Sequence, residues 1–522
     1  MYIASLLAFL VQQPSPVLTP RDSAFHALNR LAYGARPGEV DSVARAGVMR
    51  WIDQQLNPDR IPDQHLAKRE REFKILDYDR SDLAGRYRDA VRERQRMQRE
   101  AAASGDTTAL KGAGPMREFR ELGGELQQLA IVRAAISERQ LREVMVDFWT
   151  NHFNVFVGKG ADRFLLPSYI EETIRPRALG RFEDLLIATA ESPAMLFYLD
   201  NAQSVAPGSA PRWPPVVLSP FRRPRFGMNE MPEERHRRLA TGINENYARE
   251  LLELHTIGVD GGYTQQDVIE VARIFTGWSI QRPEQGAGFV FHDWAHDHGT
   301  KHVFGMTFHD DGQAEGIRLL KFLAMQHATM HHVSAKLCMR LVADEPPDGC
   351  VDAAVAAWQR TRGDIRAVLR AIFNSPDFWA PQAIGNKVKT PFEFVVSALR
   401  AAQIEPDDTP RLAQLVARLG EPLYQQPAPT GYAETESHWV NSGALLARMN
   451  AAIMIARQSP GVAANDDHAR LIDAIDQQVL AGTMSAHTRT VILEQLKDIA
   501  DPEQARVMAL GLALGGPDFQ RQ

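Results

Sequence analysis

The chain has 522 residues, enough to bury a large hydrophobic core, and this length predicts roughly two to four domains. Hydrophobic residues make up 44% and charged residues 24% of the chain, as in an ordinary globular protein. A net charge of -6 and a pI near 6.3 argue against a nucleic-acid binder that relies on phosphate contacts. With two cysteines, neither a disulfide scaffold nor a thiolate metal cluster is available.

The amino terminus carries an apolar run at residues 3–11 that resembles the core of a secretory signal. No Lys or Arg precedes the run, and no small-residue cleavage site follows it cleanly. Two interpretations remain: a truncated or mis-assigned signal peptide, or a loosely docked apolar arm. The run is too short to span a bilayer, and we find no other candidate transmembrane segment.

Residues 66–130 are dense in Arg and Glu, with few apolar positions between them. This composition predicts one or two long solvated helices that form an excursion from the body. A surface for an acidic partner is the alternative, but Glu is interspersed throughout the run, which favours a solvated helix face. Residues 101–115, rich in Ala, Gly, Ser and Thr, predict a loop.

A polar and aromatic cluster, Trp-Thr-Asn-His-Phe-Asn, occupies residues 149–154 at the end of an apolar helical pattern. Such side chains are costly in a core unless their polar atoms are paired. The cluster therefore predicts either a structural hydrogen-bond network or the lining of a site. In the second interpretation His152 is a catalytic acid or base, and Trp149 and Asn151 bind substrate.

Residues 241–258 predict a single amphipathic helix that organises the rest of the chain. Gly242 and Asn244 are candidate N-terminal capping residues, and Gly258 is a natural stop. An irregular segment rich in Pro, Arg and Ser, residues 202–238, precedes this helix directly. Long loops of this kind often cover binding sites, although a disordered insertion would have the same composition.

The polar side of this helix carries the main candidates for chemistry. Asn246, Arg249, Glu250 and Glu253 share one face, because residues three and four apart are neighbours on a helix. The plain interpretation is a solvated face with an Arg–Glu pair. The functional one gives Glu250 and Glu253, with His152 or His255, the roles of acid and base, because these groups usually transfer protons. Arg249 would then neutralise an anionic substrate group, and Asn246 would bind substrate.

Histidines are concentrated just after this helix, with eight of the 16 between residues 292 and 332. Neutral imidazole and carboxylate suit divalent transition metals, so a metal site in this loop is one hypothesis. No spacing here matches a zincin or an EF-hand. In the competing interpretation His296, Asp297 and Lys301 hydrogen-bond a polar substrate or rigidify the loop.

Cys338 lies in an apolar helical pattern, which favours the role of a small core residue, and pairing with Cys350 is possible only if the protein is exported. The remaining chain is helical in pattern, so we predict an all-α, multi-helix globular body. Long helices surround a central polar pocket in this prediction, with long loops between them and at most a minor hairpin near residues 289–304. The predicted segments are a signal-like or flexible arm (1–20), an N-terminal helical segment (21–64), a charged helical excursion and linker (65–117), a central core with the candidate site (118–345), a C-terminal part of the same body (346–460) and terminal helices (461–522).

Several long motifs carry a resemblance to a known family. Residues 244–258 and the motifs Phe-Trp-Thr-Asn-His-Phe (148–153) and Phe-Thr-Gly-Trp (275–278) resemble the bacterial family catalogued as domain of unknown function 1800. The resemblance covers the chain from about residue 24 to beyond residue 450. It implies that many relatives are exported and that they are often encoded beside a sulfatase-like family. The weak amino-terminal signal is the departure from that pattern.

Two functions follow as hypotheses. The first is an exported or envelope-associated enzyme, a hydrolase or lyase that acts on a polar polymer such as a polysaccharide. The second is a non-catalytic helical scaffold or binding partner, for example of the sulfatase-like neighbour, in which the polar clusters set the helix packing. A periplasmic or secreted location is favoured over the cytoplasm in both cases, and neither involves nucleic acid.

Overall fold

The computed structural model describes residues 18–104, 114, 116–209 and 242–522. The apolar run at residues 3–11, most of the predicted loop at 101–115 and most of the irregular segment before the organising helix lie outside this description. Within the described residues, helices dominate and are accompanied by two short two-stranded sheets. The predicted all-α fold class is confirmed.

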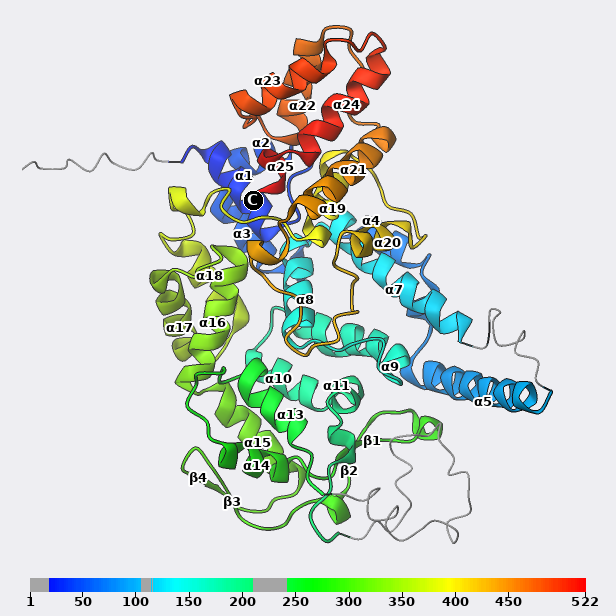
Figure 1. The fold of residues 1–522 in the computed structure, drawn as a ribbon. Helices are drawn as coiled ribbons and strands as arrows, with labels where there is room; N and C mark the ends of the chain where they lie inside the picture. The colour runs from blue at the N-terminus through cyan, green and yellow to red at the C-terminus, as the bar shows by residue number, and fades with distance from the viewer. Residues whose placement is uncertain (1–17, 105–113, 115, 210–241) are drawn as a thin grey trace, which may run out of the picture.

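The N-terminal half begins with a capped helix. The Thr19 hydroxyl accepts the amide hydrogen of Asp22, and the Asp22 carboxylate accepts that of Thr19, which forms a capping box. The longest helix, α5, is charged along its length and extends from the body (Figure 1), as its composition predicted. The helices of this half are α1 (Pro20–Leu31), α2 (Glu39–Ala46), α3 (Val48–Gln55), α4 (Gln64–Glu70), α5 (Arg80–Ser104), α7 (Arg117–Ile136), α8 (Gln140–His152), α9 (Asp162–Ser168), α10 (Phe182–Ala190) and α11 (Pro193–Tyr198).

The organising stretch differs in one respect from its prediction. Asn244 caps it as expected, accepting the amide hydrogen of Asn246 at 2.8 Å. The segment then forms α13 (Glu245–Glu250) and continues as a π-helix, η7 (Leu251–His255), rather than as one α-helix to residue 258. Three helices that surround the candidate residues follow, α14 (Gln265–Ile274), α15 (Gln313–Ala324) and α16 (His327–Leu341).

Two antiparallel hairpins lie near these helices, where at most one was predicted. The first pairs β1 (Trp278–Ile280) with β2 (Phe289–Phe291), and the second pairs β3 (Lys301–Val303) with β4 (Met306–Phe308). Both central residues of the second turn, Phe304 and Gly305, have positive φ (49° and 74°), which suits a tight hairpin turn. The pattern was missed because Phe rarely adopts this backbone conformation.

The C-terminal helices are α17 (Asp348–Thr361), α18 (Ile365–Asn374), α19 (Pro391–Ala401), α20 (Arg411–Arg418), α21 (Ser442–Gln458), α22 (His468–Val479), α23 (Ala486–Leu496), α24 (Pro502–Gly515) and α25 (Pro517–Gln520). The last helices of the chain, α22, α23 and α24 among them, lie at the end of the molecule opposite the hairpins, whereas α17 and α18 lie beside α16 (Figure 1). The described 3₁₀ helices are Pro58–Arg60, Lys74–Asp77, Arg175–Arg177, Asn201–Gln203, Pro283–Gln285, Asp293–Ala295, Pro381–Ala383 and Glu436–His438, and a further π-helix covers Tyr169–Ile174.

A disulfide joins α16 to α17. Cys338 is fully buried, as its apolar pattern predicted, but it is bonded to Cys350 rather than unpaired. Their Cα atoms are 6.2 Å apart, within the usual range for a disulfide. Helical spacing could not predict this bond, because the pairing depends on how two separate helices meet.

One hydrophobic core connects most of the helices from α1 to α25. The central helices that carry the candidate residues are therefore packed against the rest of the molecule. Its largest fully buried side chains include the indoles of Trp149, Trp278 and Trp358. Among the described residues, no helix combines the length and apolar character needed to cross a membrane.

Candidate functional site

The ten predicted site residues fall into three neighbourhoods. The first is a buried cluster at the end of α8, the second is the polar face of α13 and η7, and the third is the histidine loop between β2 and α15. In that order the members are Trp149, Asn151, His152 and His255; Asn246, Arg249, Glu250 and Glu253; and His296 and Lys301.

The two motifs at residues 149–154 and 244–258 do meet, as predicted, through two buried imidazoles. His152 and His255 are each 2% exposed, and Nε2 of His152 donates to the carbonyl oxygen of His255 at 3.2 Å. Burial lowers the pKa of His255 to about 3 and that of His152 well below its usual value, with the charge of Lys336 acting in the same direction. Both rings are therefore neutral and enclosed at physiological pH.

The other members of the α8 cluster have structural partners. The Trp149 indole is fully buried, and its Nε1 donates to the carbonyl oxygen of Ala178 at 2.9 Å. The Asn151 side chain donates to the carbonyl oxygen of Tyr432 at 2.9 Å and accepts from its amide at 2.6 Å. Asn151 thereby fastens the segment around residue 432 to the end of α8. This part of the cluster is a paired hydrogen-bond network.

The second neighbourhood holds two partly exposed carboxyl groups on neighbouring helical turns. Glu253 accepts a hydrogen bond from the Tyr263 hydroxyl at 2.9 Å. Partial burial raises the pKa of Glu250, the charge of Glu253 raises it further, and Arg249 lowers it. Glu250 is therefore protonated more readily than an ordinary Glu. Glu253 is instead oriented by its hydrogen bond with the Tyr263 hydroxyl.

The rim of this carboxyl pair is polar and partly exposed. Arg249 pairs with Glu245 at 3.3 Å and with the side-chain oxygen of Gln265 at 2.9 Å. The exposed Asn246 donates to the carbonyl oxygen of Leu199 at 3.2 Å. Arg249 retains 40% of its side-chain surface, so it can meet a group from solvent.

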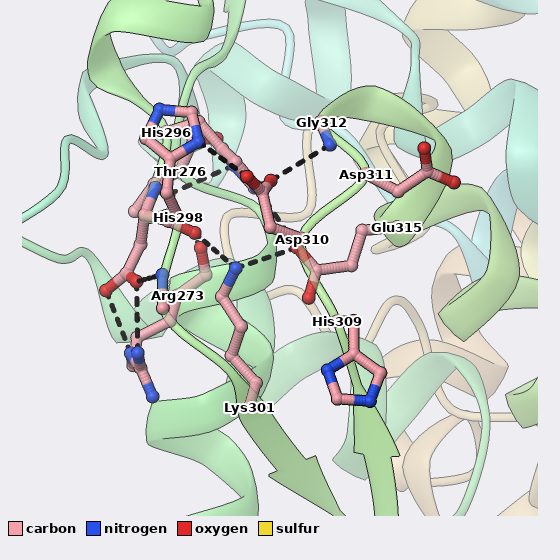
Figure 2. A network of polar contacts seen from close by, with 12 residues as sticks. Arg273, Thr276, His296, His298, Lys301, His309, Asp310, Asp311, Gly312 and Glu315 are labelled. Atoms are coloured by element: carbon pink, nitrogen blue, oxygen red, sulfur yellow. Dashed lines mark hydrogen bonds and ion pairs between the residues drawn. The ribbon is translucent and has the colours of Figure 1, made fainter.

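The third neighbourhood is a dense network built on three fully buried side chains (Figure 2). His296, Lys301 and Glu315 have side-chain exposures of 0%. Nε2 of His296 and Nζ of Lys301 lie 3.1 and 2.7 Å from the same oxygen of Glu315, Oε2. The other carboxyl oxygen of Glu315, Oε1, is buried and has no hydrogen-bond partner among the described residues.

The open side of this network is formed by Asp310. Its Oδ1 lies 3.6 Å from Nε2 of His296, while its Oδ2 lies 2.9 Å from Nδ1 of the exposed His298. Partial burial would raise the pKa of Asp310, but hydrogen bonds from His298 and from the amide of Gly312 outweigh this and lower it. The same contact raises the pKa of His298. Asp310 is therefore an ionised carboxylate that connects the buried network to solvent.

His296, Asp310 and Glu315 could together hold a metal ion, since their three ligand atoms lie within 4.8 Å of one another. Glu315 was missed in the sequence because it stands apart from the histidine cluster and just before an apolar helical pattern, where an acid is easily taken for part of a helix start. A signal was present: Glu315 lies four and eight positions before Leu319 and Leu323, on the buried stripe of that helix. An acid on an apolar stripe is costly unless it is paired, so it marks a polar site.

The structure does not place all the predicted residues around one hollow. α14 packs against both α13 and β3, and its Arg273 pairs with Asp297 of the histidine loop at 2.9 and 3.0 Å. His296 and Lys301 make polar contacts with this loop, Thr276 and Glu315, and these contacts do not include the carboxyl groups of Glu250 and Glu253. The carboxyl pair and the histidine network are therefore treated as two candidate sites.

Comparison with known proteins gives one match. The model of a family described as a protein of unknown function (DUF1800) matches residues 26–521, nearly the whole chain. No curated protein and no solved structure matches the sequence. The match agrees with the motifs at residues 148–153, 244–258 and 275–278.

Proposed function

Because this chain belongs to the DUF1800 family, for which no activity is defined, we propose a function from its geometry: an enzyme, a hydrolase or lyase, that acts on a polar polymer such as a polysaccharide. The observation that carries the proposal is the pair Glu250 and Glu253, two carboxyl groups in different environments on one helical face. Hydrolysis and elimination at a glycosidic linkage both need a proton donor and a proton acceptor, and carboxyl pairs commonly supply them.

The different surroundings of Glu250 and Glu253 assign them different roles in proton transfer. Glu250, whose pKa is raised, is the proton donor to the leaving oxygen, because a protonated carboxyl is needed there. Glu253 is the acceptor, oriented by the Tyr263 hydroxyl. Arg249 is exposed enough to bind an anionic group on the polymer. Asn246 offers its amide to a substrate hydroxyl at the same rim.

The buried histidines take a positioning role in this proposal. His152 and His255 are neutral and enclosed, so they hold η7 against α8 instead of exchanging protons with a substrate. Their effect on catalysis is indirect, because η7 carries Glu253.

Activity of three variants on a panel of neutral and acidic polysaccharides tests the assignment. Glu250→Gln and Glu253→Gln should each reduce turnover by about a hundredfold or more, a typical contribution of a general acid or base. Glu245→Gln is the matched control, because Glu245 lies on the same helix and pairs with Arg249 but has no proposed proton-transfer role. Wild-type turnover by either pair variant on a confirmed substrate would remove the assignment.

An extracytoplasmic location is part of the proposal. The Cys338–Cys350 disulfide supports it, because disulfides persist in oxidising compartments and are rare in the cytosol. Fractionation of the native host, combined with thiol labelling before and after reduction, checks the location and the bond together. A reduced, cytoplasmic protein would contradict it.

A non-catalytic binding partner of a sulfatase-like protein is the second candidate. Two adjacent apolar side chains on α21, Leu445 and Leu446, are 42% and 64% exposed, and exposed apolar surface favours docking to another protein. Leu446→Asp should then weaken co-purification with that partner while Glu250→Gln should not. Unchanged co-purification of Leu446→Asp with that partner would favour the enzyme over the binding partner.

A further inference from the structure

We infer that His296, Asp310 and Glu315 form a binding site for one divalent transition-metal ion, separate from the proposed Glu250–Glu253 centre. The inference does not depend on the proposed activity, because it rests on a different set of residues across α14. Four features carry it: the protonation of one imidazole, an unpaired buried oxygen, the ligand spacing, and a second contact for each ligand.

The imidazole of His296 has only one nitrogen available to a ligand. Its Nδ1 lies 3.0 Å from the carbonyl oxygen of Thr276. A carbonyl oxygen can only accept, so Nδ1 carries a proton, and in a neutral ring Nε2 then presents a lone pair. That lone pair faces carboxylate oxygens of Glu315 and Asp310 at 3.1 and 3.6 Å. The arrangement is repulsive unless a second proton or a cation lies between these atoms.

A second proton on His296 would still leave one carboxylate oxygen of Glu315 without a hydrogen-bond donor. The imidazolium would donate to Oε2 of Glu315, which already accepts from Lys301. The other oxygen, Oε1, would stay buried without a partner. Leaving a buried carboxylate oxygen unpaired is costly. A metal ion bound beside Glu315 can engage this oxygen, either alone or together with Oε2, and it also accepts the lone pair of His296.

The separations of the two carboxylate oxygens from Nε2 of His296 match those around a single ion, and all three ligand atoms lie within 4.8 Å of one another. Imidazole nitrogen and carboxylate oxygen bind zinc at about 2.0–2.2 Å, so neighbouring ligand atoms lie roughly 3–3.6 Å apart in tetrahedral or octahedral geometry. The separations from Nε2 of His296 are 3.1 and 3.6 Å. Asp310 keeps 36% of its side-chain surface, so the site opens on one side to solvent. Three protein ligands with an open position leave room for water or another ligand.

Each ligand is also oriented by a second contact, which is usual for metal sites. The Thr276 carbonyl orients His296, Lys301 orients Glu315, and His298 orients Asp310. Such outer contacts fix the tautomer and direction of the ligands before the ion binds. The nitrogen ligand favours zinc, manganese or iron over magnesium, which prefers oxygen ligands and water.

Metal content and binding of the untagged full-length chain test the inference. After treatment with chelator and its removal, titration with ZnCl₂ or MnCl₂ should show one saturable site and a rise in the melting temperature, whereas MgCl₂ should show neither. Co²⁺ titration should produce d–d absorption bands from the nitrogen-containing site. Absence of saturable binding by Zn²⁺, Mn²⁺ and Co²⁺ would overturn the inference.

Variants then locate the ion. Asp310→Asn and Glu315→Gln should abolish saturable binding, and His298→Ala should weaken affinity by about tenfold, the effect of losing an outer contact. Because Glu315 is buried and its variant could fail to fold, the partly exposed Asp310 provides the deciding substitution. Asp311→Asn and His309→Ala are matched controls on the same loop and should bind as the wild type does. Equal binding by Asp310→Asn and wild type would mean adventitious metal and reject the site.

The result is independent of the proposed enzyme. Glu250→Gln should retain the metal fully, because Glu250 lies on α13 and contributes no ligand. A metal-free but active protein would reject the ion and leave the carboxyl pair intact. A metal-bound protein whose activity survives both Glu250→Gln and Glu253→Gln would support the metal site and reject the carboxyl pair as the catalytic centre.

Discussion

The Nε2 atom of His152 donates to the backbone carbonyl oxygen of His255 over 3.2 Å, across 103 positions of the chain. This contact fastens the end of α8 to the π-helical half of the organising stretch. Both imidazoles are neutral because burial opposes their charged forms. A charged form of either ring would be a buried charge without a partner, so the stability of this region depends on pH.

Acid should destabilise the protein through these histidines. The folded-state pKa of His255, about 3, is lower than the unfolded value, so its contribution to stability is present above pH 6.5 and is lost as pH falls towards 3. One such histidine lowers the free energy of unfolding by up to about 1.4 kcal/mol per pH unit in that window. Denaturant titrations at several pH values measure this slope. His255→Gln should make it shallower, whereas a change at the exposed His309 should not.

Replacing Glu250 by Gln should leave the fold intact. The pKa of Glu250 is raised by burial and by Glu253, so its stabilising contribution is greatest at low pH and is lost as pH rises through the folded value. Above neutral pH the neutral Gln removes this penalty, and the melting temperature should stay level or rise slightly. Thermal melts at pH 8 give the comparison. A clear drop would show that the carboxylate belongs to a buried structural pair.

Lys301→Met should destabilise the metal-free protein strongly. Lys301 and Glu315 form a fully buried pair, and removing one partner leaves an uncompensated charge that typically costs about 3–5 kcal/mol. An added Zn²⁺ ion should recover much of this loss, because it supplies positive charge to Glu315. The melting temperature is measured in chelator and in zinc.

The surface pair of Lys497 with Glu494, at 4.0 Å, provides the control for that experiment. Lys497→Met should cost less than about 1 kcal/mol and should show no rescue by zinc, because exposed pairs contribute little. A Lys301→Met protein whose loss is the same with and without zinc would favour a purely structural ion pair.

Loss of the disulfide should cost roughly 3 kcal/mol, the chain-entropy value for a closed loop of this length. The bond joins residues 12 positions apart on α16 and α17. The double variant Cys338→Ala/Cys350→Ala should melt below the oxidised wild type. Reducing agent should lower the melting temperature of the wild type only. Equal effects on both proteins would indicate that the thiols are unpaired in solution.

Local patterns predicted much of this fold, because helix ends are set by nearby side chains. Thr264 caps α14 through a capping box with Asp267, three positions away. Asn244 caps α13, and the meeting of residues 149–154 with the organising helix was also anticipated. The two caps depend on residues that are close in sequence. The meeting of the two motifs could be anticipated because polar residues are unusual beside an apolar helical pattern.

The remaining features depend on tertiary contacts that one sequence does not display. Glu315 is recognisable as a site residue only once Lys301 and His296 are seen beside it. The Cys338–Cys350 bond needs the packing of two helices. The separation of the carboxyl pair from the histidine network arises because α14 packs between α13 and β3.

The wider turn of η7 holds one residue more than an α-helical turn would, because its backbone hydrogen bonds span five positions instead of four. Within this turn the partly exposed Glu253 and the buried His255 lie two positions apart, on different sides of the helix axis. A segment of five residues therefore presents a carboxyl group to solvent and an imidazole to the interior.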